Sequence, residues 1–152
     1  MNRKEHRAEL LLAIRQREET AARRRFDVAR VRAEGIRRRL AELQRLLVGH
    51  DQAARKRLTG STGPQTMAAY RADLAELREA IGRQSAALDE ADRALADCRA
   101  GLLEAMSRRN AVGLLHQKLL DRRSRSQDLA EAGRVDDMHA SRLAWVGQAP
   151  AE

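Results

Sequence analysis

Apolar residues recur with a seven-residue repeat along two long stretches of the chain. Before residue 59, alternating intervals of four and three residues separate ten positions: Ala22, Phe26, Ala29, Ala33, Ile36, Leu40, Leu43, Leu47, His50 and Ala54. After residue 64 the same alternation runs through sixteen positions: Met67, Tyr70, Leu74, Leu77, Ile81, Gln84, Leu88, Ala91, Leu95, Cys98, Leu102, Ala105, Arg109, Val112, His116 and Leu119. A sustained heptad repeat is typical of a left-handed coiled coil, whereas a strand needs a period of two. The pattern therefore predicts an all-α protein with two long helices and two buried seams.

A cluster of helix-breaking residues, Thr59–Pro64, separates the two stretches. Gly60 suits a left-handed C-cap, Ser61 or Thr62 can cap the next helix, and Pro64 fits a first helical turn. We expect one coiled-coil hairpin domain spanning 1–152. It would have a helix over 5–58, a turn over 59–64, an antiparallel and longer helix over 65–146, and a flexible tail over 147–152.

The pairing of the two seams follows from folding the chain about the turn. Residues whose numbers add up to about 123 should lie opposite each other, which places Leu43 near Ile81, Leu47 near Leu77 and His6 near Lys118. On this register, residues after about 119 have no partner in the first helix. The apolar residues there (Leu129, Val135, Met138 and Leu143) would need a partner protein to bury them.

Composition argues against an enzyme with a deep pocket. Only 2% of the 152 residues are aromatic and 34% are charged, so the rings that fill a globular core are missing. The four histidines include no pair at the i, i+4 spacing of a helical zinc site, and Asp136, Asp137 and His139 are typical of a solvated helix face. There is also no phosphate-binding glycine loop and no nucleophile with a base. We expect no catalysis, no cofactor and no metal.

The sequence also bears on location. A single cysteine, Cys98, cannot form an intramolecular disulfide. No apolar run approaches the roughly 18 residues of a membrane span, and the N-terminal stretch does not have the form of a signal peptide. We therefore expect a cytoplasmic protein.

Positive charge is concentrated in the first helix. The net charge is +8 overall, and residues 1–58 alone carry +9, with arginine clusters at Arg23–Arg25 and Arg37–Arg39. These clusters are either a basic stripe for an acidic partner or ordinary charges beside a coiled-coil seam. A DNA-binding zipper would instead place a separate basic block before its seam, so we expect no nucleic-acid partner, although a nucleic-acid-binding coiled coil stays an alternative.

Three segments carry a resemblance to a known family. They are Leu10–Glu19 at the basic, amphipathic start, Tyr70–Ile81 after the turn, and Val135–Arg142 near the end. With the length and the single hairpin, this layout resembles FliJ of the flagellar export apparatus and its injectisome relative YscO. The family commonly ends in a Met-Asp-Glu-like motif, where this chain has Val135, Asp136 and Asp137.

The resemblance implies a stalk protein of type III export. Such a protein would bind a hexameric export ATPase, a membrane export-gate protein and export chaperones, on the cytoplasmic side of the inner membrane. We expect the ATPase to contact the end of the second helix, at Arg122, Arg123, Arg125, Leu129, Val135, Asp136, Asp137, Met138 and Arg142. The gate would contact the hairpin near its turn, at Leu43, Leu47, Leu77, Ala80 and Gln84. A flagellum and an injectisome are both compatible with these residues, and a general coiled-coil adaptor is a further alternative.

Overall fold

Two α-helices make up nearly all of the described structure. The computed structural model describes residues 3–60 and 63–146. Helix α1 spans Arg3–Leu58 and helix α2 spans Pro64–Val146, so that only three described residues lie outside them. The described residues contain no strand, and the second helix is the longer one, as the sequence predicts. The predicted tail over 147–152 lies outside the described residues.

Two short-range hydrogen bonds form at the C-terminal end of α1. The Gly60 N–H donates to the Arg57 carbonyl at 3.1 Å, and the Thr59 hydroxyl donates to the Lys56 carbonyl at 2.7 Å. The predicted left-handed glycine cap is wrong, because no described glycine has a positive φ, and a short i→i−3 bond ends α1 instead. Helix α2 begins at Pro64, one residue before the predicted start at 65, and the Gly63 carbonyl accepts its first hydrogen bond, from Met67 at 3.3 Å. The predicted caps Ser61 and Thr62 lie outside the described residues.

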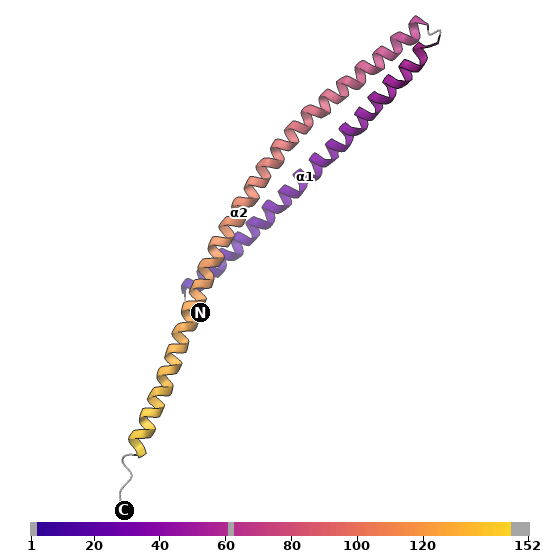
Figure 1. The fold of residues 1–152 in the computed structure, drawn as a ribbon. Helices are drawn as coiled ribbons and strands as arrows, with labels where there is room; N and C mark the ends of the chain where they lie inside the picture. Colours follow the sequence, from indigo (N-terminus) through magenta and orange to yellow (C-terminus); the bar gives the residue numbers. More distant parts are fainter. Residues whose placement is uncertain (1–2, 61–62, 147–152) are drawn as a thin grey trace, which may run out of the picture. The chain divides into compact units, whose positions relative to one another are not determined.

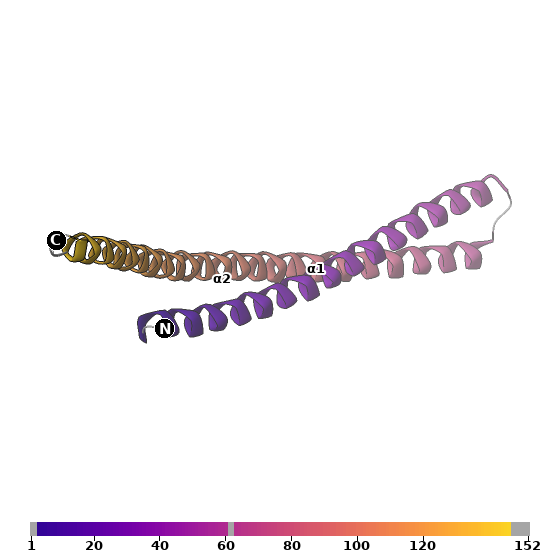
Figure 2. The same ribbon diagram turned by 90° about the horizontal axis from the view of Figure 1, so that it is seen from below.

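The chain divides into two compact units, which we describe separately. The turn unit comprises Glu19–Ala105, and the terminal unit comprises Met1–Glu18 with Met106–Glu152. Within the turn unit, α1 and α2 run side by side in opposite directions from the turn (Figure 1). In a view turned by 90°, α1 passes across α2 in this unit, as expected for helices that wind around each other (Figure 2).

The core of the turn unit is the predicted seam. Every predicted seam position between Ala22 and Ala105 is buried or half-buried. The most completely buried apolar residues are Ala33, Leu43 and Ala91. The heptad register predicted from the sequence is therefore confirmed, and the small alanines at the seam explain how two helices can pack without aromatic residues.

The terminal unit continues the heptad spacing with polar side chains in the seam. Glu5, Ala8, Leu12 and Arg15 follow the alternation of three and four residues, and all four are buried or half-buried. On α2, Val112, His116 and Leu119 are half-buried at the predicted positions. Leu12 lies close to α2, since a Cβ added at Gly113 would be 3.9 Å from Leu12 Cδ1. Neither α1 nor α2, over the residues described, contains a stretch apolar and long enough to cross a bilayer.

Candidate partner-binding surfaces

The end of α2 is solvent-exposed along its whole described length. All described side chains from Asp121 to Trp145 are exposed, including every predicted ATPase-contact residue. Leu129 and Leu143 are 75% and 74% exposed, and Val135 and Met138 are 49% and 61% exposed. Apolar side chains this exposed are available to a partner surface.

These four apolar residues spread over about half of the circumference of α2. An α-helix turns by about 100° per residue, so Leu129 and Leu143, which are 14 residues apart, lie within about 40° of each other. Val135 lies about 80° from Leu143, and Met138 lies about 60° further round, nearly opposite Leu129. A flat surface could cover one edge of this arc, whereas a concave partner that surrounds the helix could cover all four residues.

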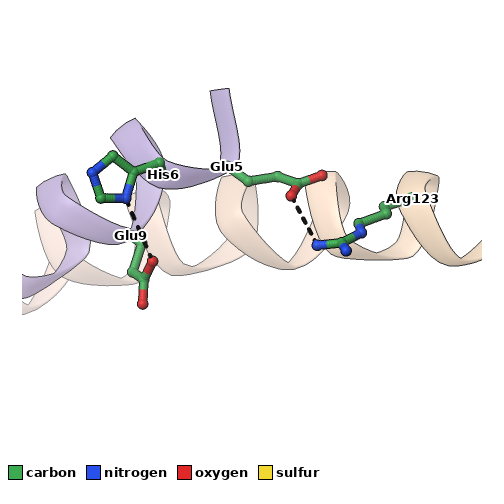
Figure 3. Close-up of polar contacts among 4 residues, drawn as sticks. All are labelled: Glu5, His6, Glu9 and Arg123. Atoms are coloured by element: carbon green, nitrogen blue, oxygen red, sulfur yellow. Dashed lines mark hydrogen bonds and ion pairs between the residues drawn. The ribbon is translucent and has the colours of Figure 1, made fainter. Parts of the chain in front are cut away.

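One predicted contact residue, Arg123, takes part in packing within the terminal unit (Figure 3). Its Nη1 donates to Glu5 Oε2 at 3.2 Å, and the Glu5 side chain is only 8% exposed. The prediction that residues after about 119 lack a partner in α1 is therefore wrong for Arg123. The side chains of Glu5 and Arg123 are both long, so they can meet although the expected register places their backbones about one helical turn apart. On its own helix, His6 has Nδ1 4.0 Å from Glu9 Oε2.

The remaining charged residues of the predicted ATPase contact stand free of ion pairs within the part of the chain that the structure describes. They are Arg122, Arg125, Asp136, Asp137 and Arg142. The Asp137 backbone carbonyl accepts a hydrogen bond from the Ser141 hydroxyl at 2.8 Å, which is a contact within one helix turn. Among residues 3–60 and 63–146, no group of three or more His, Cys, Asp or Glu side chains could hold a metal ion.

Exposed apolar residues of the terminal unit that sequence reasoning missed lie near its seam. Leu10, Ile14, Leu114 and Leu115 are each at least half exposed. The heptad register could have identified them from the sequence, because only Leu12 of the run Leu10–Leu12 falls on the seam when it is continued toward the N-terminus. The other leucines of such a run must face outward, which enlarges the apolar surface that the terminal unit offers.

A shallow hollow in the turn unit brings two of the five predicted gate residues together. Leu77 and Ala80 line it with Leu46, His50, Asp73 and Glu76, and its volume is about 330 Å³. None of these four neighbours was predicted to contact the gate, although Leu46 is an apolar residue outside the predicted seam. The other predicted residues, Leu43, Leu47 and Gln84, are buried or half-buried at seam positions, so that they pack between the helices.

Aromatic contacts fix one side of this hollow. The His50 and Tyr70 rings meet edge to face, with centroids 6.4 Å apart, and the Arg57 guanidinium lies 5.4 Å from the Tyr70 centroid. His50 Nδ1 is buried and has no hydrogen-bond partner in the described structure. Tyr70 of α2 therefore holds the His50 side chain, which forms one wall of the hollow, and Arg57 holds the Tyr70 ring in turn.

The described helices define an all-α class of protein, with two long helices packed along a heptad seam, exposed apolar residues at the end of α2 and a hollow in the turn unit. A comparison with protein-family models places the chain more narrowly. The model of the flagellar FliJ protein family matches residues 4–149, so the chain belongs to this family. Neither a curated protein nor a solved structure matched the chain. Family membership makes the chain a component of flagellar export.

Proposed function

We propose that the protein is the stalk of the flagellar export apparatus, where its terminal unit binds the hexameric export ATPase and its turn unit binds the membrane export gate. The observation that carries this proposal is the family match over residues 4–149, which includes both surfaces. The protein would have no catalytic role of its own. It would act at the cytoplasmic side of the inner membrane, held there by its partners, and export chaperones would be further partners.

The end of α2 supports the ATPase assignment through its shape. A helix that enters the central opening of a ring is approached by subunits from several sides. Leu129, Leu143, Val135 and Met138 are exposed over about half of the circumference of this helix, which matches such an environment. Arg142 and the carboxylates Asp136 and Asp137 add exposed charges of both signs, which suits weak contacts with successive subunits.

The hollow beside the seam supports the gate assignment. Leu46 is 51% exposed, and it lies with Leu77 and Ala80 in a concave surface that a partner side chain can enter. Asp73 and Glu76 line the same hollow, so that a partner with a basic residue beside an apolar one fits best.

Nucleic-acid binding is the less supported alternative, although residues 1–58 carry a net charge of +9. Many of the arginines of this segment already have a carboxylate partner, although most of these carboxylates are counted in the net charge. Ion pairs with carboxylates engage Arg15, Arg23, Arg30, Arg37, Arg39 and Arg55. A duplex would have to compete with these carboxylates for the same guanidinium groups.

Truncation tests the ATPase assignment. Deleting residues 127–152 removes the exposed end of α2 and keeps the Glu5–Arg123 contact. We expect the truncated chain to keep its thermal unfolding transition and to lose copurification with the cognate export ATPase. Copurification at the level of the full chain would contradict the assignment. A salt titration with duplex DNA tests the alternative, because phosphate binding weakens steeply with salt.

A further inference from the structure

A second concave surface in the turn unit shares no residue with the surfaces assigned above. It is a groove of about 390 Å³ between α1 and α2. Its α1 wall includes Arg24, Arg25, Arg32 and Val28, and its α2 side includes Ala94 and Cys98. We call this surface the arginine groove.

The groove follows from the size of the residues that flank the two seams. On α2, small residues recur every seven positions, at Ala80, Ala87, Ala94 and Gly101. On α1, Arg25 and Arg32 share the same seven-residue spacing, so they stay on one face of a coiled-coil helix. Large side chains opposite small ones leave space beside the seam. At Gly101 a Cβ would meet no neighbouring atom within 4 Å.

The three arginines of the groove differ from their neighbours in having no ion pair within residues 3–60 and 63–146. The nearest carboxylates on α1 are already used, because Asp27 and Glu34 both pair with Arg30. The groove wall therefore holds uncompensated guanidinium groups, which favour carboxylates of a partner and bind them with charge-assisted hydrogen bonds.

The groove also offers apolar contact between its charges. Val28 is 71% exposed, although it lies one helical turn from Arg25 and from Arg32. The spacing from Arg25 to Arg32 is about 10 Å along a helix, or two turns. A partner helix with apolar residues at three- and four-residue intervals and acidic residues seven apart would meet both features.

Two acidic residues flank the α2 side of the groove, although they do not line it. Glu90 and Asp97 lie four residues before and three residues after Ala94, so the three side chains share one face of α2. Both carboxylates are exposed, and they would repel the phosphates of a nucleic acid. We propose that the arginine groove docks an amphipathic helix of a partner protein, with acidic residues along the edge that meets α1.

Cys98 gives a direct assay, because it lines the groove and is the single cysteine of the chain. The full chain is alkylated with N-ethylmaleimide in the presence of a synthetic 21-residue helical peptide. The peptide has a seam of Leu and Ile, Glu along one edge and Lys along the other. We expect saturable slowing of Cys98 alkylation. A peptide with Lys in place of every Glu is the matched control and should give no slowing.

Charge reversal identifies the surface. Arg25→Glu with Arg32→Glu should weaken protection of Cys98 at least tenfold, since a lost charge-assisted hydrogen bond costs about that factor in affinity. Arg38→Glu with Arg45→Glu changes the charge of the same helix equally, and both residues lie outside the groove lining, so protection should persist. Thermal unfolding of both variants checks that the hairpin remains folded.

Three results would overturn the proposal. The first is alkylation that the acidic peptide does not slow at millimolar concentration. The second is equal protection in both charge-reversal variants. The third is protection of Cys98 by duplex DNA without protection by the peptide, which would make the groove a phosphate-binding surface.

Discussion

Glu5 and Arg123, which are 118 residues apart in sequence, form an ion pair of 3.2 Å between α1 and α2 of the terminal unit. The Glu5 side chain is 8% exposed and that of Arg123 is 45% exposed. A carboxylate buried to this degree needs a charged or polar partner, because burying an uncompensated charge is costly. The pair therefore specifies which turn of α2 lies beside the start of α1.

A double-mutant cycle measures this coupling. We expect Arg123→Ala and Glu5→Gln each to lower the free energy of unfolding in urea. The interaction energy between them should be about 1 kcal/mol, because one partner is largely exposed to solvent. Two strictly additive changes would mean that Glu5 and Arg123 do not interact in solution.

The seam predicts a sharp contrast between two leucines of α1 that are three residues apart. Leu43 is 6% exposed and Leu46 is 51% exposed. Leu43→Ala should lower the free energy of unfolding by about 2–5 kcal/mol, because it opens a cavity between the helices. Leu46→Ala, the matched control, should cost less than about 1 kcal/mol. Equal losses in chemical denaturation would contradict the seam register.

The hollow near the turn predicts a position-specific loss of gate binding. Ala80 lines the hollow and lies outside the heptad seam, so Ala80→Glu should reduce affinity for the cytoplasmic part of the gate protein at least tenfold. Ala75→Glu is the charge-matched control, because Ala75 is an exposed residue of α2 that does not line the hollow. Isothermal titration calorimetry compares the two variants, with helicity measured by circular dichroism. Unchanged binding by the folded Ala80→Glu variant would exclude this face.

The sequence predicted the seam where apolar residues carry it and missed it where they do not. In the turn unit, heptad spacing of apolar side chains identified the buried Ala33, Leu43 and Ala91 but not the buried Glu19. In the terminal unit the same spacing continues through Glu5 and Arg15, which an apolar pattern cannot reveal. Buried polar residues are stable only with particular partners. Glu5, for example, accepts from Arg123 at 3.2 Å, and such contacts depend on side-chain geometry.

The candidate sites were predictable to a smaller extent. Register alone identifies which leucines must face outward, but a hollow depends on the sizes of residues opposite each other. Leu77 and Ala80 were assigned to the gate through family resemblance, whereas Asp73 and Glu76 became part of that surface only through the packing of α1 against α2. The charge pattern of the sequence also does not show which arginines are paired. Arg37 and Arg25 both lie in arginine clusters of α1, but only the packing of the helices places Asp92 of α2 beside Arg37.

The exposed end of α2 gives a prediction that separates a surrounding partner from a flat one. Leu129→Glu with Leu143→Glu places two charges at one edge of the exposed apolar arc, and Val135→Glu with Met138→Glu places two toward its other edge, about 130° away around the helix. If the ATPase ring surrounds α2, both double variants should weaken ATPase binding at least tenfold, because each buries two carboxylates against an apolar or crowded wall. If α2 lies on a flat surface of the ATPase, only one of them should do so.

Val31→Glu with Val48→Glu is the control, since these exposed valines belong to the turn unit. Binding is measured by biolayer interferometry with the assembled hexamer. Full binding by both α2 variants would show that this end of the helix is not the ATPase contact.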